Sequence, residues 1–141
     1  MGNYITGNWN DMPWEPVKPT LAHKVFTGSL GTANLAVFTN GHPINPHKHV
    51  YEQFMMILQG ECDCYVDGEK LRLTPGSWVM IPPEVMHYME VYDSSCPVIN
   101  LDIYLPKRDE RYDKYKNFCD SLSPEEFAKA CEGFKIKNYD K

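Results

Sequence analysis

Between Ala22 and Leu105 the chain is a succession of short runs in which β-branched, aromatic and other apolar residues recur. Each run has the length of a strand and is separated from the next by Gly, Pro, Asn, Asp or Ser. In chain order the predicted strands are AHKVFTG, TANLAVF, QFMMILQ, CDCYV, KLRL, SWVMI, HYMEVY and VINLDIY. Eight short strands without an intervening helix predict an all-β fold, a small antiparallel sandwich or barrel.

Turn residues support this division. Asp67-Gly68 lies between two of the runs and is a strong signal for a two-residue hairpin. The stretch from Thr74 to Ser77 predicts a second turn, and Pro82-Pro83 a third break.

The two ends of the chain differ from its middle. Residues 1–21 form a proline-rich arm, expected to be irregular and held down by Trp9 and Trp14. Residues 22–106 are the predicted barrel. Residues 107–141 are a predicted helical C-terminal extension, packed on the barrel or on a partner subunit. Its helix is expected to start at Ser123, with Pro in the first turn and Glu three residues after Ser, and to end near Gly133.

Composition narrows the function classes. A chain of 141 residues fits one domain, and a net charge of −5 without a basic stripe argues against nucleic acid as a partner. The apolar runs are too short to span a membrane, and the first residues lack the features of a secretory signal. The five cysteines show no zinc-type spacing and are expected to be reduced thiols. We therefore expect a cytoplasmic protein.

The stretch HKHVYEQ contains the candidate chemistry. If residues 47–59 form a strand, His47, His49, Tyr51 and Gln53 share one face, and Glu52 points to the other. Two histidines at this spacing can reach one cation, with the Gln53 amide oxygen as a further ligand. An isolated pair of this kind is also compatible with a solvent-facing position.

Two motifs resemble the signatures of the cupin superfamily. In the first, Gly41, the two histidines, Gln53 and Gly60 recur at its spacing, with Gln where Glu is usual. In the second, Pro82-Pro83-Glu84-Val85-Met86-His87 ends on its histidine ligand. The resemblance implies a conserved jelly-roll β-barrel that holds one divalent metal ion. Zinc, nickel, iron and manganese remain open. The implied ligands are His47, His49, Gln53 and His87.

A narrower resemblance is to the small cupins that convert unsaturated uronates from pectin and alginate into linear ketonised sugars. It includes the closing pattern Asp-x-aromatic-x-Pro-x-Arg over residues 102–108. It implies that Asp102 transfers a proton, that Arg108 clamps a substrate carboxylate and that Tyr104 forms a wall of the site. Tyr51 is a second candidate for proton transfer.

A ligand set of three imidazoles and a neutral amide leaves the charge of a divalent metal uncompensated, which favours Lewis-acid chemistry over redox chemistry. We therefore expect a metal-dependent isomerase or lyase that isomerises, opens or eliminates from a small oxygen-rich anion. The alternatives are an iron-dependent dioxygenase and a non-catalytic sensor of metal or sugar. The resemblance also implies a homodimer, with Met55, Met56 and Trp78 available either for the core or for a contact.

Overall fold

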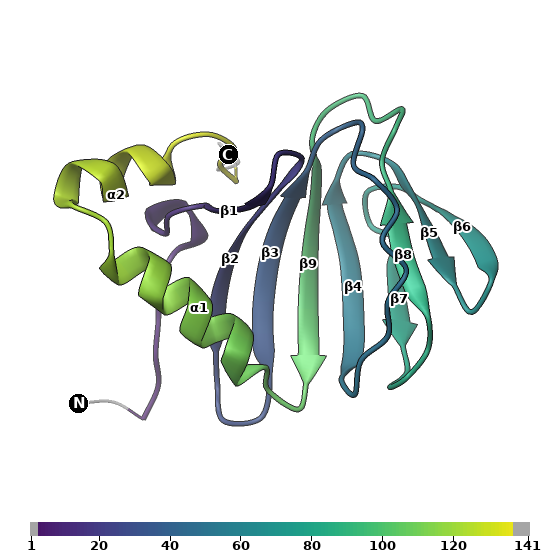
Figure 1. Cartoon of the computed structure of the whole chain (residues 1–141), viewed down its shortest axis with the longest axis horizontal. Coiled ribbons are helices and arrows are strands. Elements are labelled where there is room, and N and C mark those ends of the chain that lie inside the picture. The colour runs from purple at the N-terminus through teal and green to yellow at the C-terminus, as the bar shows by residue number, and fades with distance from the viewer. Residues whose placement is uncertain (1–2, 137–141) are drawn as a thin grey trace, which may run out of the picture.

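The computed structural model describes residues 3–136, which form two β-sheets and a helical C-terminal segment (Figure 1). One sheet has six strands in the order β1-β2-β3-β9-β4-β7, the other has three in the order β6-β5-β8, and all neighbouring pairs are antiparallel. The elements are a 3₁₀ turn Trp9–Asp11, β1 Glu15–Lys18, β2 Leu21–Thr27, β3 Thr32–Phe38, β4 Glu52–Gln59, β5 Cys62–Val66, β6 Glu69–Leu73, β7 Trp78–Ile81, β8 His87–Glu90, β9 Val98–Leu105, α1 Asp109–Asp120 and α2 Pro124–Cys131.

All eight predicted strands are confirmed, as β2 to β9, and the architecture is the expected cupin-type jelly roll with a helical tail. Strand β1 was not predicted. It lies in the arm that was expected to be irregular, and it pairs with β2. Pro16 hides this strand in the sequence, because proline cannot donate to a ladder and is found mainly on sheet edges such as this one.

The predicted hairpin joins β5 and β6. Val66 pairs with Glu69, and the two residues between them have the positive φ angles that a type I′ turn requires, 50° at Asp67 and 82° at Gly68. The second turn is also present, with the Ser77 N–H donating to the Thr74 carbonyl over 2.9 Å. β7 ends at Ile81, directly before the two prolines.

The inner faces of the two sheets enclose the main core. Alternate residues of the strands point inward, among them Ile57 on β4 and Val98 on β9, both essentially inaccessible to solvent. Met55 belongs to this core, whereas Trp78 on the edge strand β7 is 74% exposed. On β9 the inward residues change along the strand from apolar Val98 to polar Asn100 and Asp102, so that one end of the interior is polar.

The arm and the tail cover part of the outer face of the large sheet. Trp14 packs there against Leu35 and Ile99. Lys24 is 1% exposed; its ammonium lies 4.3 Å from the Trp14 ring centroid and donates to the Trp9 carbonyl over 2.6 Å. Burial lowers the pKa of Lys24 to about 8.

Both helices belong to the predicted extension. α2 has the expected capping box between Ser123 and Glu126. The sequence did not locate α1, because its residues are mostly polar and only Tyr115 is buried. The Tyr115 hydroxyl donates to the Pro13 carbonyl over 2.7 Å, and the Trp14 N–H donates to the Ala130 carbonyl over 2.8 Å. The extension therefore packs on its own chain. Neither helix within residues 3–136 is long and apolar enough to cross a bilayer.

Candidate metal centre and its cavity

The histidine segment is not the strand that the alternation argument assumed. β4 begins only at Glu52, so residues 47–51 lack the strand alternation assumed for them, whereas the predicted strand QFMMILQ is present. The backbone instead pairs with the segment that follows β7: His47 and His87 exchange N–H···O bonds of 3.1 and 2.9 Å, and the Glu84 N–H donates to the His49 carbonyl over 2.8 Å. This pairing brings the third histidine beside the other two.

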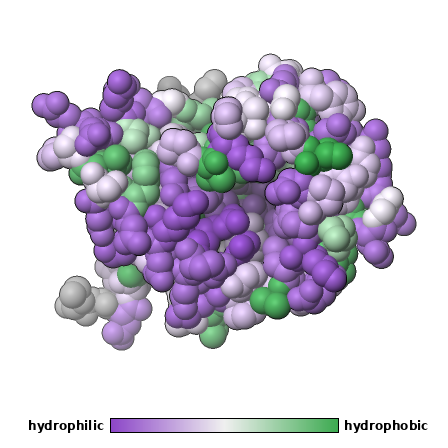
Figure 2. All heavy atoms as spheres, in the orientation of Figure 1, coloured by the Kyte–Doolittle hydropathy of each residue, from purple (hydrophilic) through white to green (hydrophobic). Residues whose placement is uncertain are grey.

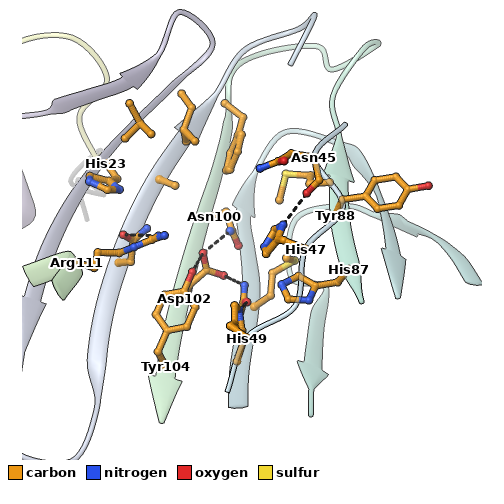
Figure 3. Close-up of a pocket in the computed structure, with 18 of the residues that line it drawn as sticks. His23, Asn45, His47, His49, His87, Tyr88, Asn100, Asp102, Tyr104 and Arg111 are labelled. Carbon is orange, nitrogen blue, oxygen red and sulfur yellow. Dashed lines mark hydrogen bonds between the residues drawn. The ribbon is translucent and has the colours of Figure 1, made fainter. Parts of the chain in front are cut away.

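The three histidines converge (Figure 3). Their ligand atoms all lie within 4.8 Å of one another. The His87 ring centroid is 4.3 Å from that of His47 and 4.9 Å from that of His49. Three imidazoles at this separation can hold one cation.

Backbone contacts orient all three rings in the same way. Nδ1 of His47, His49 and His87 lies 2.6, 3.0 and 2.9 Å from the carbonyl oxygens of Asn45, Tyr51 and Val85, respectively. A carbonyl oxygen only accepts hydrogen bonds, so each Nδ1 carries a proton, and in a neutral ring of this tautomer Nε2 keeps its lone pair.

His87 gives the clearest sign that this site fits a metal ion. Its Nε2 is buried and has no hydrogen-bond partner among the described residues. Burial, the largest cause, lowers the pKa of His87 to about 4 and also lowers the pKa of His49. Both rings are therefore neutral near pH 7, the state that binds a metal.

Gln53 places an amide oxygen beside the three imidazole nitrogens. It is 4% exposed and donates from Nε2 to Asp102 Oδ1 over 2.8 Å. With Nε2 directed at Asp102, the amide turns Oε1 the other way, and this oxygen lies 3.1 Å from His49 Nε2. Two lone pairs face each other there, an arrangement that a cation between them stabilises. Gln53 thus points inward, as the sequence predicted.

Asp102 organises the polar end of the interior. Besides the Gln53 amide, its carboxylate accepts from Asn100 Nδ2 over 3.0 Å and from the Tyr104 hydroxyl over 3.4 Å. Burial raises the pKa of Asp102, although these hydrogen bonds oppose the shift. Asn100 was not among the predicted site residues. Its position two residues before Asp102, on the same face of a strand, was the available signal.

Helix α1 begins at the edge of the cavity. The Arg108 guanidinium carbon lies 4.8 Å from the Tyr51 ring centroid and 4.7 Å from that of Tyr104, and its Nε pairs with Glu110 at 3.0 Å. The Tyr51 hydroxyl also donates to Glu110, over 3.1 Å. Tyr51 therefore lies at the rim, outside the group of residues that line the cavity.

Arg111 also lines the cavity and was missed. Arg108 is the N-cap residue directly before α1 and Arg111 lies in its first turn, and both side chains line the cavity. The spacing of the two arginines was visible in the sequence, but helix α1 itself was not located. Its guanidinium carbon is 5.5 Å from the Tyr104 ring centroid.

The cavity between the sheets has a volume of about 400 Å³, and Figure 2 shows a hollow bordered largely by hydrophilic residues. Its lining has an excess of positive charge. Four cationic side chains line it, against one carboxylate, that of Asp102. The cations are Lys18, Lys48, Arg108 and Arg111.

The two other histidines have structural partners. His23 lies 2.6 Å from Glu15, and His42 lies 2.8 Å from the Thr20 hydroxyl. Neither belongs to the three-histidine cluster.

Comparison with protein families gives one match, to the Cupin domain, over residues 34–104. The match covers half of the chain, including all three clustered histidines and Gln53. The chain belongs to the cupin family. Solved structures with a similar fold agree with this assignment of the cupin. KdgF from Halomonas sp. is 27% identical with a TM-score of 0.64, over 70% of this chain and 91% of KdgF. An RmlC-like cupin from Shewanella frigidimarina is 22% identical with a TM-score of 0.67, over 79% and 96%.

Part of a transcriptional regulator is also similar in sequence to this cupin. This cupin is 32% identical over 65 residues to an uncharacterised HTH-type transcriptional regulator, YobQ, from Bacillus subtilis. The match covers 45% of this chain but only 27% of the regulator.

Proposed function

We propose that this cupin is a metal-dependent enzyme of non-redox chemistry that isomerises, opens or eliminates from a small oxygen-rich anion such as an unsaturated uronate. One observation carries the proposal: a set of neutral metal donors lies in a cavity whose lining has four cationic side chains and one buried carboxylate. In a protein of net charge −5, such a local excess of positive charge selects an anionic ligand.

The donors are Nε2 of His47, His49 and His87 and Oε1 of Gln53. A divalent ion held there polarises a substrate oxygen or acidifies a bound water. Because all four donors are uncharged, the set does little to stabilise a more oxidised metal, which favours the non-redox reading.

Asp102 is the residue proposed to move the proton. It lines the cavity, and burial has already raised its pKa towards the range in which a carboxyl group exchanges protons efficiently. Tyr104 shares that proton network through its hydroxyl and forms one wall. Tyr51 is better suited to holding Glu110 and Arg108 in place, because its hydroxyl is already donated to Glu110.

Arg108 is proposed to clamp the substrate carboxylate. Its Nε is used by Glu110, but a guanidinium has further N–H donors on the other two nitrogens, and these suit a bidentate contact with a carboxylate. The resemblance to uronate-ketonising cupins and the structural similarity to KdgF support this choice of substrate class.

The test is turnover of an unsaturated uronate from pectin or alginate by protein reconstituted separately with zinc, nickel, iron or manganese. Loss of the substrate double bond is followed by absorbance, and the product is identified by NMR. Gln53→Ala and Asp102→Asn should lower turnover at least a hundredfold, whereas Lys114→Gln, at an exposed position of α1, should leave it unchanged. An unaltered rate in Asp102→Asn contradicts its proposed role.

The alternatives give different results in the same assay. A dioxygenase consumes oxygen with iron and stops under nitrogen, whereas the proposed chemistry continues. The observation that supports the second alternative, a non-catalytic sensor, is the sequence match to part of a transcriptional regulator. A sensor would show ligand-dependent thermal stabilisation with every metal and no product by mass spectrometry.

A further inference from the structure

Two arginines at the start of α1 line the same cavity, Arg108 at the N-cap and Arg111 in the first turn, and the proposed reaction uses only Arg108. Arg108 and Arg111 lie 4.7 and 5.5 Å from the Tyr104 ring centroid, measured from their guanidinium carbons. They are therefore separated by no more than the sum of these distances. Figure 3 shows Arg111 on the side of the cavity where His23 lies, across Asp102 from the three histidines.

The charges of the two arginines are compensated differently. Arg108 pairs with Glu110 at 3.0 Å. Within residues 3–136, no carboxylate lies within ion-pair distance of Arg111, and its one side-chain hydrogen bond is a long one, 3.5 Å from Nη1 to Asn34 Oδ1. Most of its five N–H donors therefore remain available to a ligand.

Asn100 provides a second, independent sign of a ligand. It is 1% exposed and lines the cavity; its Nδ2 donates to Asp102, and its Oδ1 has no hydrogen-bond partner among the described residues. Leaving a buried acceptor unpaired is costly, and a ligand hydroxyl that donates to it removes that cost. In the pairing of β3 with β9, Asn34 lies opposite Asp102 and Ala36 lies opposite Asn100. The unpaired Asn100 oxygen is therefore close to Asn34, which contacts Arg111, on the inner face of the sheet.

We propose that Arg111, Asn34 and Asn100 form a second subsite, which binds an acid group together with a neighbouring hydroxyl. The inference rests on the proposed function, because it takes Arg108 and the metal donors as the first subsite. The preferred substrate is then a polyhydroxylated dicarboxylate, with one carboxylate on each arginine. A cavity of about 400 Å³ is large enough for a six-carbon chain of this kind.

The test is binding, by isothermal titration calorimetry of the zinc-loaded protein, of three open-chain probes with the same carbon number. D-glucitol has no carboxylate, D-gluconate has one and D-glucarate has two. We expect D-glucarate to bind at least about tenfold more tightly than D-gluconate, because a charged hydrogen bond is added, and D-glucitol to bind most weakly.

Variants separate the two subsites. Arg111→Gln should weaken D-glucarate at least about tenfold and change D-gluconate less than about twofold, whereas Arg108→Gln should weaken both acids. Arg111→Lys keeps the charge and should retain part of the preference. Lys114→Gln removes the same charge from an exposed position of α1 and should change neither affinity. Melting temperatures check that each variant is folded.

The outcomes distinguish this subsite from the proposed function. Equal affinities of the wild type for the two acids, an equal loss of both in Arg111→Gln, or no binding of either acid would overturn it. Turnover of an unsaturated uronate without a preference for D-glucarate leaves the proposed function and removes the subsite. A preference for D-glucarate without turnover of the uronate supports the subsite and contradicts the proposed function.

Discussion

Removing the Asp102 carboxylate in two different ways separates its role in positioning Gln53 from its role in moving a proton. Asp102→Ala deletes the acceptor of the Gln53 and Asn100 amides and of the more distant Tyr104 hydroxyl, leaving three buried donors unpaired. Asp102→Asn keeps an oxygen for the Gln53 amide. Its new NH₂ group then faces Asn100, whose amide can rotate to present the oxygen that now has no partner.

The expected magnitudes follow from this count. An unpaired buried donor costs about 1–3 kcal/mol, and the alanine variant also no longer buries a carboxylate, so we expect a net loss of about 2–4 kcal/mol of unfolding free energy. Zinc affinity should fall about 10- to 100-fold, as it does when a group that orients a metal ligand is removed. Asp102→Asn should lower the unfolding free energy by less than about 1 kcal/mol, and its zinc affinity should stay within about threefold of the wild-type value. Both variants should lose turnover by about 10²-fold or more.

Urea denaturation gives the free energies, and competition with a fluorescent chelator gives the zinc affinities. The reasoning is refuted if Asp102→Ala binds zinc as tightly as the wild type, because Gln53 would then need no orientation by this carboxylate. Equal losses of zinc affinity in both variants would show that the negative charge matters more than the hydrogen-bond geometry.

Three further predictions concern the pH response, the packing and the assembly. The pKa of His87 is lowered to about 4 in the folded state, so the unfolded chain binds this proton first as pH falls. The free energy of unfolding of the metal-free protein should fall by up to about 3 kcal/mol between pH 6.5 and pH 4. His87→Gln should make this free energy depend less on pH in the same range. Gly60→Ala should cost about 2–4 kcal/mol in urea denaturation, because φ is +79° and the new Cβ would lie 2.9 Å from Val98 Cα. Gly76→Ala, at φ +94° with nothing within 4 Å, should cost less, and equal losses would contradict the packing argument. We also propose that the expected homodimer buries the apolar outer face of β7, so Trp78→Glu should convert it to a monomer in light scattering, whereas a monomeric wild type would contradict the proposal.

Most of the barrel could be predicted because alternation and turn residues are local signals. The eight strands and the hairpin at Asp67-Gly68 needed no information from distant residues. The route by which the histidines meet could not be predicted in this way. His47 is positioned by backbone bonds to His87, forty residues later, and no local pattern encodes such pairing.

The missed residues have the same physical explanation. Arg111 and Asn100 become notable only when α1 and β9 are placed beside one cavity. A polar helix without an apolar stripe, such as α1, gives little sequence signal, because tertiary contacts like the one from Tyr115 to Pro13 hold it in place.

The position of α1 divides the work between two parts of the chain. The proposed metal donors all come from the barrel and the loop that precedes β4, whereas both arginines come from the start of the extension after its last strand, Arg108 at the N-cap of α1 and Arg111 in its first turn. If the two proposed subsites bind acids, changes at the start of this helix retune which acids are accepted while the metal donors stay in place. The start of α1 is then the place to alter selectivity in protein engineering.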